Sequence, residues 1–230
     1  MEKIVYALSR KSSESTDVFA RRLLSELAER FIGRHAVRLA VAVHDADVAP
    51  ADRLRIIHRR PAIDAVVSLW VNSSNDHSRI ETQLCDYAGT VEGYLVTESE
   101  VLQGPESGGP GERTPGMMQI AFLRIPEGLS HERWFSIWRD DHTQVAIQTQ
   151  STFVYRQNLV VRPLTVGATD CAAIVEEAFP VEAMTSQHAF YDAVGADDKL
   201  ERNRQRMFDS SMRFVDLAKI DVLPASEYVW

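Results

Sequence analysis

The sequence has few cysteines and no long hydrophobic run. It contains 2 cysteines in 230 residues, Cys85 and Cys171, and their separation matches no zinc or redox spacing. We therefore expect reduced, packed thiols, no metal site and a cytoplasmic protein. No stretch approaches the roughly 20 consecutive apolar residues that a membrane helix requires. The amino-terminal segment carries an early charge and a short apolar run, so we expect neither a signal peptide nor a membrane partner.

Positive charge is also scarce. The chain has 25 Lys and Arg residues against 33 Asp and Glu residues, a formal net charge of -8. Such a charge repels nucleic acids and anionic membranes. The densest arginine cluster, Arg202, Arg204 and Arg206, alternates with polar residues and is typical of a solvated helix face. The sequence has no phosphate-binding glycine loop and no dinucleotide fingerprint, so we expect no nucleic-acid or nucleotide partner.

The first 102 residues predict a ferredoxin-like unit. Residues 3–9 alternate like a strand, and residues 13–31 follow helical spacing, with Ser15 or Thr16 as the N-cap and Gly33 as the stop. The further predicted elements are strands at 36–44 and 63–71, a helix at 75–87 and a strand at 91–102. The order strand, helix, strand, strand, helix, strand is that of the split βαβ unit.

A glycine- and proline-rich linker, QGPESGGPGERTPG at residues 103–116, precedes a second unit with the same order of elements. We therefore predict three segments, 1–102, 103–116 and 117–230. The predicted elements of the second unit are strand 117–125, helix 130–148, strands 152–162 and 171–179, helical segments 182–194 and 198–215, and strand 217–222. Two such sheets placed face to face form an α+β barrel, and we expect a cavity for a small ligand between them.

The residues that can carry chemistry are concentrated in 130–162, a predicted helix followed by a strand. His142, near the end of the helix, has an ordinary pKa of about 6.5 and is the natural proton carrier at neutral pH. The alternative is a structural histidine bonded to a backbone carbonyl. Asp140 and Asp141 either orient His142 or form an ordinary solvated pair, because adjacent helical residues point in different directions. We find no spacing typical of a metal site.

The strand and the helix also offer polar and aromatic side chains for a ligand. Tyr155 and Arg156 point to opposite sides of the strand, so at most one of them faces a cavity. Tyr155 could donate a proton to a developing enolate or phenolate, and Arg156 could hold a carboxylate or oxyanion. Asn158 shares the face of Arg156, and the register stays open. Trp134 and Trp138, four residues apart, form either core or an aromatic platform.

The second half contains Arg124, the helix WFSIWRDDH at 134–142, YRQN at 155–158 and EEAF at 176–179. In these residues it resembles the EthD-like branch of the dimeric α+β barrel superfamily. The resemblance covers residues 117–230 well and 1–102 weakly, and it implies a small cofactor-free barrel with His142 at the mouth of a cavity. Thr143 and Gln144 depart from the family, which usually has a small residue and a proline there. The first half lacks the aromatic helix, so we expect one site per chain, built mainly from the second half.

The residues and the resemblance together predict a cofactor-free lyase, dehydratase, isomerase or cyclase of a degradation or polyketide-tailoring pathway. We expect it to act on a small apolar carbonyl or aromatic compound. A non-catalytic binding protein for a hydrophobic small molecule is one alternative, and a haem protein with His35, His142 or His188 as axial ligand is another. We also expect a homodimer, although the internal repeat could make the chain self-sufficient. The candidate catalytic residues are His142, Tyr155 and Arg156, and the candidate substrate-binding residues are Trp134, Trp138, Asn158 and Asp141.

Overall fold

The computed structural model describes residues 1–105 and 109–230, so positions 106–108 of the predicted linker lie outside the described residues. Ser15 caps the first helix by accepting a hydrogen bond from the Val18 N–H, and Gly33 follows the helix with a φ of 73°. The elements of the first half are β1 Glu2–Ser9, α1 Thr16–Phe31, β2 Arg38–Val43, the 3-10 helix η1 Ala46–Leu54, β3 Ala65–Val71, η2 Ser74–Asp76, α2 His77–Leu84 and β4 Thr90–Leu102.

The second half repeats this order with a larger helical layer. The predicted helix at 130–148 is one helical run with a π-helical segment in its middle, and the predicted helical stretch at 182–194 contains only two short turns. The elements are β5 Met117–Leu123, α3 His131–Ser136, the π-helix η3 Ile137–His142, α4 Thr143–Thr149, β6 Val154–Pro163, β7 Ala173–Phe179, η4 Val181–Met184, α5 Gln187–Phe190, α6 Asp197–Ser211 and β8 Asp221–Val229.

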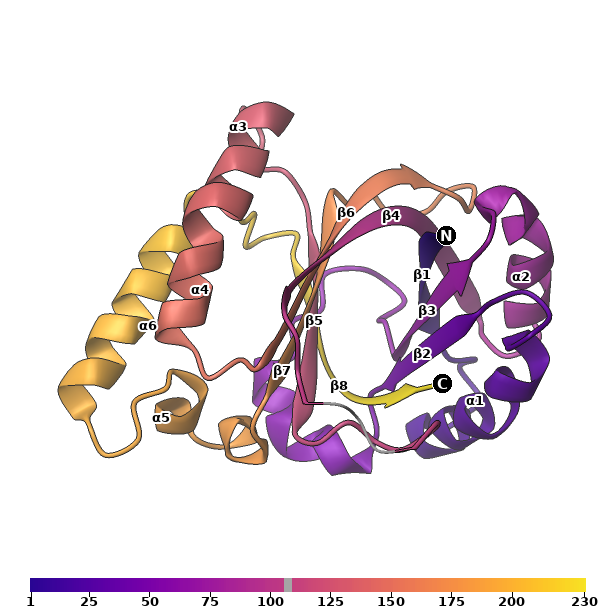
Figure 1. Cartoon of the computed structure of the whole chain (residues 1–230), viewed down its shortest axis with the longest axis horizontal. Helices are drawn as coiled ribbons and strands as arrows, with labels where there is room; N and C mark the ends of the chain where they lie inside the picture. The colour runs from indigo at the N-terminus through magenta and orange to yellow at the C-terminus, as the bar shows by residue number, and fades with distance from the viewer. Residues whose placement is uncertain (106–108) are drawn as a thin grey trace.

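The strands close into one antiparallel barrel in the order β1-β3-β2-β8-β5-β7-β6-β4. Each half contributes four neighbouring strands, and the halves join where β2 pairs with β8 and β4 pairs with β6. The predicted fold class, two tandem ferredoxin-like units forming an α+β barrel, is confirmed. Figure 1 shows the barrel between two groups of helices, with α1 and α2 on one side and α3, α4, α5 and α6 on the other.

The prediction for the last strand is wrong. We expected a strand at 217–222, whereas β8 begins at Asp221 and continues to Val229. Proline cannot donate to a ladder of hydrogen bonds, so the strand can contain Pro224 only where one of its sides is unpaired. In the barrel, β2 pairs with β8 only from Ser226 onward, so Pro224 faces a β-strand on one side alone.

Side chains alternate between the barrel interior and the two helical layers. The middle of the interior is filled from both halves, so the cavities described below lie at one end of the barrel and beneath the helices. The interior cluster includes Val5, Val66, Met118, Ile120, Phe122, Ile174 and Leu223. Both faces of the central strands are therefore buried, and β3 and β7 have no exposed residue.

The two cysteines lie in different surroundings. Cys171 is buried, which raises the pKa of its thiol to about 12. Cys85 is exposed at the end of α2, so the prediction of a packed thiol is wrong there. Within the described ranges, no helix combines the length and the apolar character needed to cross a membrane.

Candidate functional site

Two adjacent glutamates of β7 point in opposite directions. Glu176 faces the barrel interior, where its carboxylate contacts Lys3 and Arg156. Glu177 lines a cavity between the sheet and the helices of the second half. The alternation of side chains along a strand therefore places two identical carboxyl groups in separate sites.

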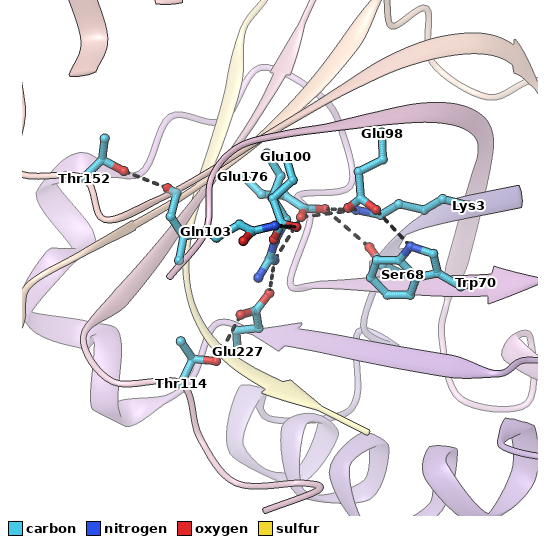
Figure 2. A network of polar contacts seen from close by, with 12 residues as sticks. Lys3, Ser68, Trp70, Glu98, Glu100, Gln103, Thr114, Thr152, Glu176 and Glu227 are labelled. Carbon is cyan, nitrogen blue, oxygen red and sulfur yellow. Dashed lines mark hydrogen bonds and ion pairs between the residues drawn. The ribbon is translucent and has the colours of Figure 1, made fainter. Parts of the chain in front are cut away.

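The interior site is a network of paired charges at one end of the barrel. Lys3 Nζ donates to Glu98 Oε1 at 2.7 Å and to Glu176 Oε1 at 3.0 Å, and Figure 2 shows the lysine beside both carboxylates. Arg156 Nη1 donates to Glu176 Oε2 at 3.2 Å and to Glu227 Oε1 at 2.6 Å. Each of these carboxylates thus has a cationic partner.

The pairing decides how these groups are charged. Burial alone would raise the pKa of Glu176, but the charges of Lys3 and Arg156 outweigh burial and hold the pKa below its ordinary value. Burial would lower the pKa of Arg156, but Glu227 and Glu176 raise it. A cavity of about 240 Å³ opens at this end, and its lining includes Arg38, Glu100, Arg156 and Glu227.

Arg156 and Asn158, two residues that the sequence analysis selected, belong to this interior face. Asn158 is fully buried, and its Nδ2 donates to the Ile174 carbonyl oxygen at 2.9 Å. Its Oδ1 has no hydrogen-bond partner among the described residues. The open register is thereby resolved: Arg156 and Asn158 face the barrel, and Tyr155 faces the helices.

A second hollow, which we call the helix-layer cavity, lies between β5, β6 and β7 and the helices η3 and α6. Its volume is about 110 Å³. Every residue of the lining belongs to the second half of the chain. Most of the lining is apolar, and it includes Ala121, Leu123, Trp138, Val175, Met207, Phe214, Val215, Ile220 and Val222 beside the polar residues Gln119, His142, Tyr155, Glu177 and Ser211.

Strand register brings three of the polar residues to one level of the sheet. Tyr155 of β6 is the partner of Glu177 on β7, and Glu177 is in turn the partner of Gln119 on β5. Side chains at directly paired positions on one face are about 5 Å apart at Cβ. A hydroxyl, a carboxyl and an amide therefore stand in a row beneath the helices.

The helix above this row is built irregularly. Ser130 caps α3 by accepting a hydrogen bond from the Arg133 N–H at 3.2 Å, which is half of a capping box. The following segment widens into a π-helix that ends at His142. Thr143 Oγ1 donates to the Trp138 carbonyl oxygen at 3.3 Å, five residues earlier. Single π-turns inside α-helices occur frequently at functional sites.

His142 is held in place as a neutral base. Its Nδ1 lies 2.9 Å from Ser210 Oγ on α6, and its ring packs against Phe214 with 4.5 Å between centroids. Burial, assisted by the nearby charge of Arg213, lowers the pKa of His142 to about 4. At neutral pH the imidazole therefore has one donor and one acceptor nitrogen.

Glu177 is the exceptional group of the cavity. Its Oε1 is buried without a hydrogen-bond partner among the described residues. Burial raises the pKa of this carboxyl to about 7, and no cation in residues 1–105 or 109–230 opposes the shift. A carboxyl group with such a pKa changes its protonation state near neutral pH.

Tyr155 completes the polar row. Its hydroxyl oxygen accepts a hydrogen bond from Gln157 Nε2 at 3.1 Å, and the same Nε2 donates to Thr143 Oγ1 at 2.8 Å. Burial, together with the charge of Glu177, raises the pKa of Tyr155. The phenol thus stays protonated and can serve as a hydrogen-bond donor.

The site residues predicted from the sequence do not all lie in one place in the structure. His142, Tyr155 and Trp138 line the helix-layer cavity. Trp134 lies outside that lining, stacked on Trp138 with 5.1 Å between centroids. Asp141 points away and pairs with Arg213 at 2.6 Å on the surface.

Sequence reasoning did not assign roles to Glu177, Gln157 or Thr143. A usable signal was present for the glutamates, because two consecutive carboxylates in an otherwise apolar strand must face opposite sides. Gln157 and Thr143 carry no comparable signal, since their contact depends on how the π-helix packs on β6.

The residues of the helix-layer cavity do not fit a haem. Pockets for ligands of drug size have about 300–1,000 Å³, and this one has about 110 Å³. Of the other candidate axial ligands, His35 Nε2 contacts Gln83 at 3.0 Å and His188 Nε2 contacts the exposed Asp197 at 2.8 Å. Among the described residues, no group of three or more His, Cys, Asp or Glu side chains is arranged to hold a metal ion.

No protein-family profile and no curated protein matches the chain. Solved structures resemble its fold. An anthrone oxidase-like protein aligns over 100% of this chain and 92% of its own, with 10% identity and a TM-score of 0.55. A monooxygenase-like protein from Fusobacterium nucleatum aligns over 99% and 91%, with 8% identity and a TM-score of 0.52. At these identities the likeness concerns the fold alone: the chain shares the α+β barrel architecture of these proteins.

Proposed function

We propose that the protein is a cofactor-free acid/base enzyme that acts on a small, largely apolar carbonyl or aromatic compound in the helix-layer cavity. One observation carries the proposal: Oε1 of the Glu177 carboxyl is buried without a hydrogen-bond partner among the described residues, and the pKa of this carboxyl is about 7. A general base or acid works best when its pKa is near the working pH. The earlier hypothesis gave this role to His142, whose pKa of about 4 makes it a weaker base.

The roles follow from the protonation states. The Glu177 carboxylate removes a proton from the carbon next to the carbonyl group of the substrate. The electron pair moves toward the carbonyl oxygen, which accepts a hydrogen bond from the Tyr155 hydroxyl. Glu177 then returns the proton to the same carbon or to a conjugated one, so the step is redox-neutral.

The neighbouring groups support this chemistry. Gln157 holds the Tyr155 oxygen, and neutral His142 supplies a further donor or acceptor at the cavity wall. The apolar lining excludes water, which strengthens each electrostatic interaction inside. Isomerisation through an enolate needs only this set of groups. In dehydration the protonated Glu177 carboxyl would also have to deliver its proton to the leaving hydroxyl group, and in decarboxylation it would protonate the carbon that loses CO2. Arg156 lies on the opposite face of β6 and takes no part.

The test is solvent deuterium exchange. Purified protein is incubated in D2O with a panel of small ketones and aryl ketones, and NMR follows the loss of the α-proton. We expect catalysed exchange, and a loss of about a hundredfold in its rate in Glu177→Gln. Glu182→Gln, which changes an exposed carboxylate, is the matched control and should exchange like the unmodified protein.

A non-catalytic binding protein is the second candidate, favoured by the small volume and apolar lining of the cavity. It predicts that a ketone binds and that its α-proton does not exchange faster than in buffer. Equal exchange rates in the unmodified protein and in Glu177→Gln would contradict the enzymatic proposal. Homodimerisation stays a prediction, which native mass spectrometry checks.

A further inference from the structure

Another, larger hollow lies beside the helix-layer cavity. This outer groove has a volume of about 520 Å³. Gln119, Met207 and Ser211 line both hollows and therefore form the wall between them. The other residues of the groove are Ile56, Gln150, Phe190, Tyr191, Arg204, Gln205, Phe208 and Leu217.

The groove presents apolar side chains to solvent. Phe208 is 54% exposed, Leu217 is 47% exposed and Ile56 is 39% exposed. They come from α6, from the loop before β8 and from the loop after η1, so three separate segments place large apolar groups around one hollow. Exposed apolar residues gathered in this way mark a binding surface, whereas single ones need no explanation.

Met207 is the adjustable part of the wall. It lies on α6 with its Sδ 3.8 Å from Thr149 Oγ1 of α4. Methionine is unbranched and has three rotatable side-chain bonds, so it changes shape at low cost. Because Met207 lines both hollows, its side chain lies where a passage between the cavity and the groove would run.

The volumes of the helix-layer cavity and the outer groove also favour a ligand that occupies both. The inner cavity of about 110 Å³ is smaller than the pockets of most small-molecule ligands, which have at least about 300 Å³. The groove is large enough but has no buried carboxyl group in its lining. A ligand that reaches through the wall would use both the space of the groove and the chemistry of the cavity.

We propose that the outer groove binds the body of an elongated, largely apolar carbonyl compound whose reacting end passes Met207 into the helix-layer cavity. This inference rests on the proposed function for the identity of the reacting end. The groove supplies apolar contacts to an aromatic ring system, and Phe208 is its main contact because that side chain is both large and half exposed.

The experiment is a binding series by isothermal titration with two ketones, 2-acetylnaphthalene and butanone. We expect the unmodified protein to bind 2-acetylnaphthalene at least tenfold more tightly than butanone. Phe208→Ala should weaken 2-acetylnaphthalene about tenfold and leave butanone unchanged. Val37→Ala removes an exposed apolar side chain outside both linings and should change neither.

A second pair of variants tests passage through the wall. Met207→Trp should weaken binding of 2-acetylnaphthalene at least tenfold, whereas Met207→Leu, which changes the size of the side chain little, should bind like the unmodified protein. An unchanged melting temperature of Met207→Trp separates a blocked passage from a misfolded variant. Unchanged binding of 2-acetylnaphthalene in both Phe208→Ala and Met207→Trp would overturn the inference.

The experiments test the groove inference and the catalytic proposal independently of each other. If Phe208 and Met207 control binding while no α-proton exchanges, the groove stands and the catalytic proposal fails. If butanone exchanges in a Glu177-dependent manner while 2-acetylnaphthalene binds no better than butanone, the catalytic proposal stands and the groove inference fails.

Discussion

Glu176 and Glu177 are adjacent on one strand, yet their pKa values are shifted in opposite directions. Glu176 faces the barrel, where Lys3 and Arg156 hold its pKa below the ordinary value despite burial. Glu177 faces the helices, where burial without a cation raises its pKa to about 7. The comparison teaches that the pairing of a buried carboxyl, rather than burial itself, decides whether it stays charged or becomes available for proton transfer.

The barrel face and the helix face of the sheet also differ in the effect expected from substitutions. On the barrel face the charges are matched, so removing one partner leaves another buried and unpaired. On the helix face, Glu177 has no ion-pair partner within the part of the chain that the structure describes. We therefore expect substitutions on the first face to act on folding and those on the second to act on turnover.

The largest effect is expected from Arg156→Met. This change leaves Glu176 and Glu227 without their shared guanidinium, and the free energy of unfolding should fall by about 3–5 kcal/mol. Chemical denaturation with guanidinium chloride measures the loss. A decrease below about 1 kcal/mol, the size of an exposed ion pair, would mean that Glu176 and Glu227 do not depend on the Arg156 guanidinium for their burial.

The second effect concerns stability against pH. The pKa of Glu177 is raised from 4.5 to about 7, so the folded protein binds this proton more tightly than the unfolded chain does. Its favourable contribution is present below pH 4.5 and is lost as the pH rises through about 7. The loss amounts to about 3 kcal/mol. Glu176 acts in the opposite sense, because its lowered pKa stabilises the fold above its ordinary value and that stability is lost in acid.

Glu177→Gln isolates this contribution. The variant lacks the titrating group, so its stability relative to the unmodified protein should increase between pH 4.5 and pH 7. Unfolding free energies of both proteins across that range give the difference, in which the other groups cancel. A difference that does not change with pH would contradict the raised pKa.

The third effect concerns the phenol on the helix face. Tyr155→Phe removes the hydroxyl that we assign to the carbonyl oxygen, and exchange should slow by about a hundredfold. Gln157→Leu removes the donor that holds this oxygen and should slow exchange by a smaller factor. If Tyr155→Phe exchanges at the unmodified rate, the carbonyl oxygen is stabilised elsewhere.

The smallest effect is expected at Asp141. Asp141→Asn weakens an exposed pair with Arg213, so stability should change by less than about 1 kcal/mol. Exchange should keep its rate, because Asp141 lies outside the lining of the helix-layer cavity. A tenfold decrease in the exchange rate would contradict this and show that Asp141 contributes to the reaction.

Much of the fold could be predicted because its strands and helices leave short-range patterns of apolar residues in the sequence. Alternation in 3–9 and helical spacing in 13–31 gave β1 and α1 within a few residues, and the repeated order of elements indicated the barrel. The last strand was predicted too early in the chain, and its observed range includes Pro224 at a position where β2 does not pair with β8. That condition depends on the neighbouring strand and not on the sequence of β8.

The site was less accessible to prediction. Alternation placed Tyr155 and Arg156 on opposite faces, but both faces of β6 are buried at these positions, so hydrophobicity could not tell inside from outside. The surroundings of His142 depend on a π-helix that 3.6-residue spacing does not foresee. Pairing between Lys3 and Glu176 joins residues of different halves, and a local pattern contains no information about such a contact.

The most direct test of the account is the titration of the two glutamates in one sample. Carbon-detected NMR of the side-chain carboxyl carbons reports both midpoints, with Glu177→Gln and Glu176→Gln providing the assignments. The account predicts a midpoint near 7 for Glu177 and a midpoint below 4.5 for Glu176. A midpoint at or below 4.5 for Glu177 would contradict its role as the proton-transfer group of the helix-layer cavity.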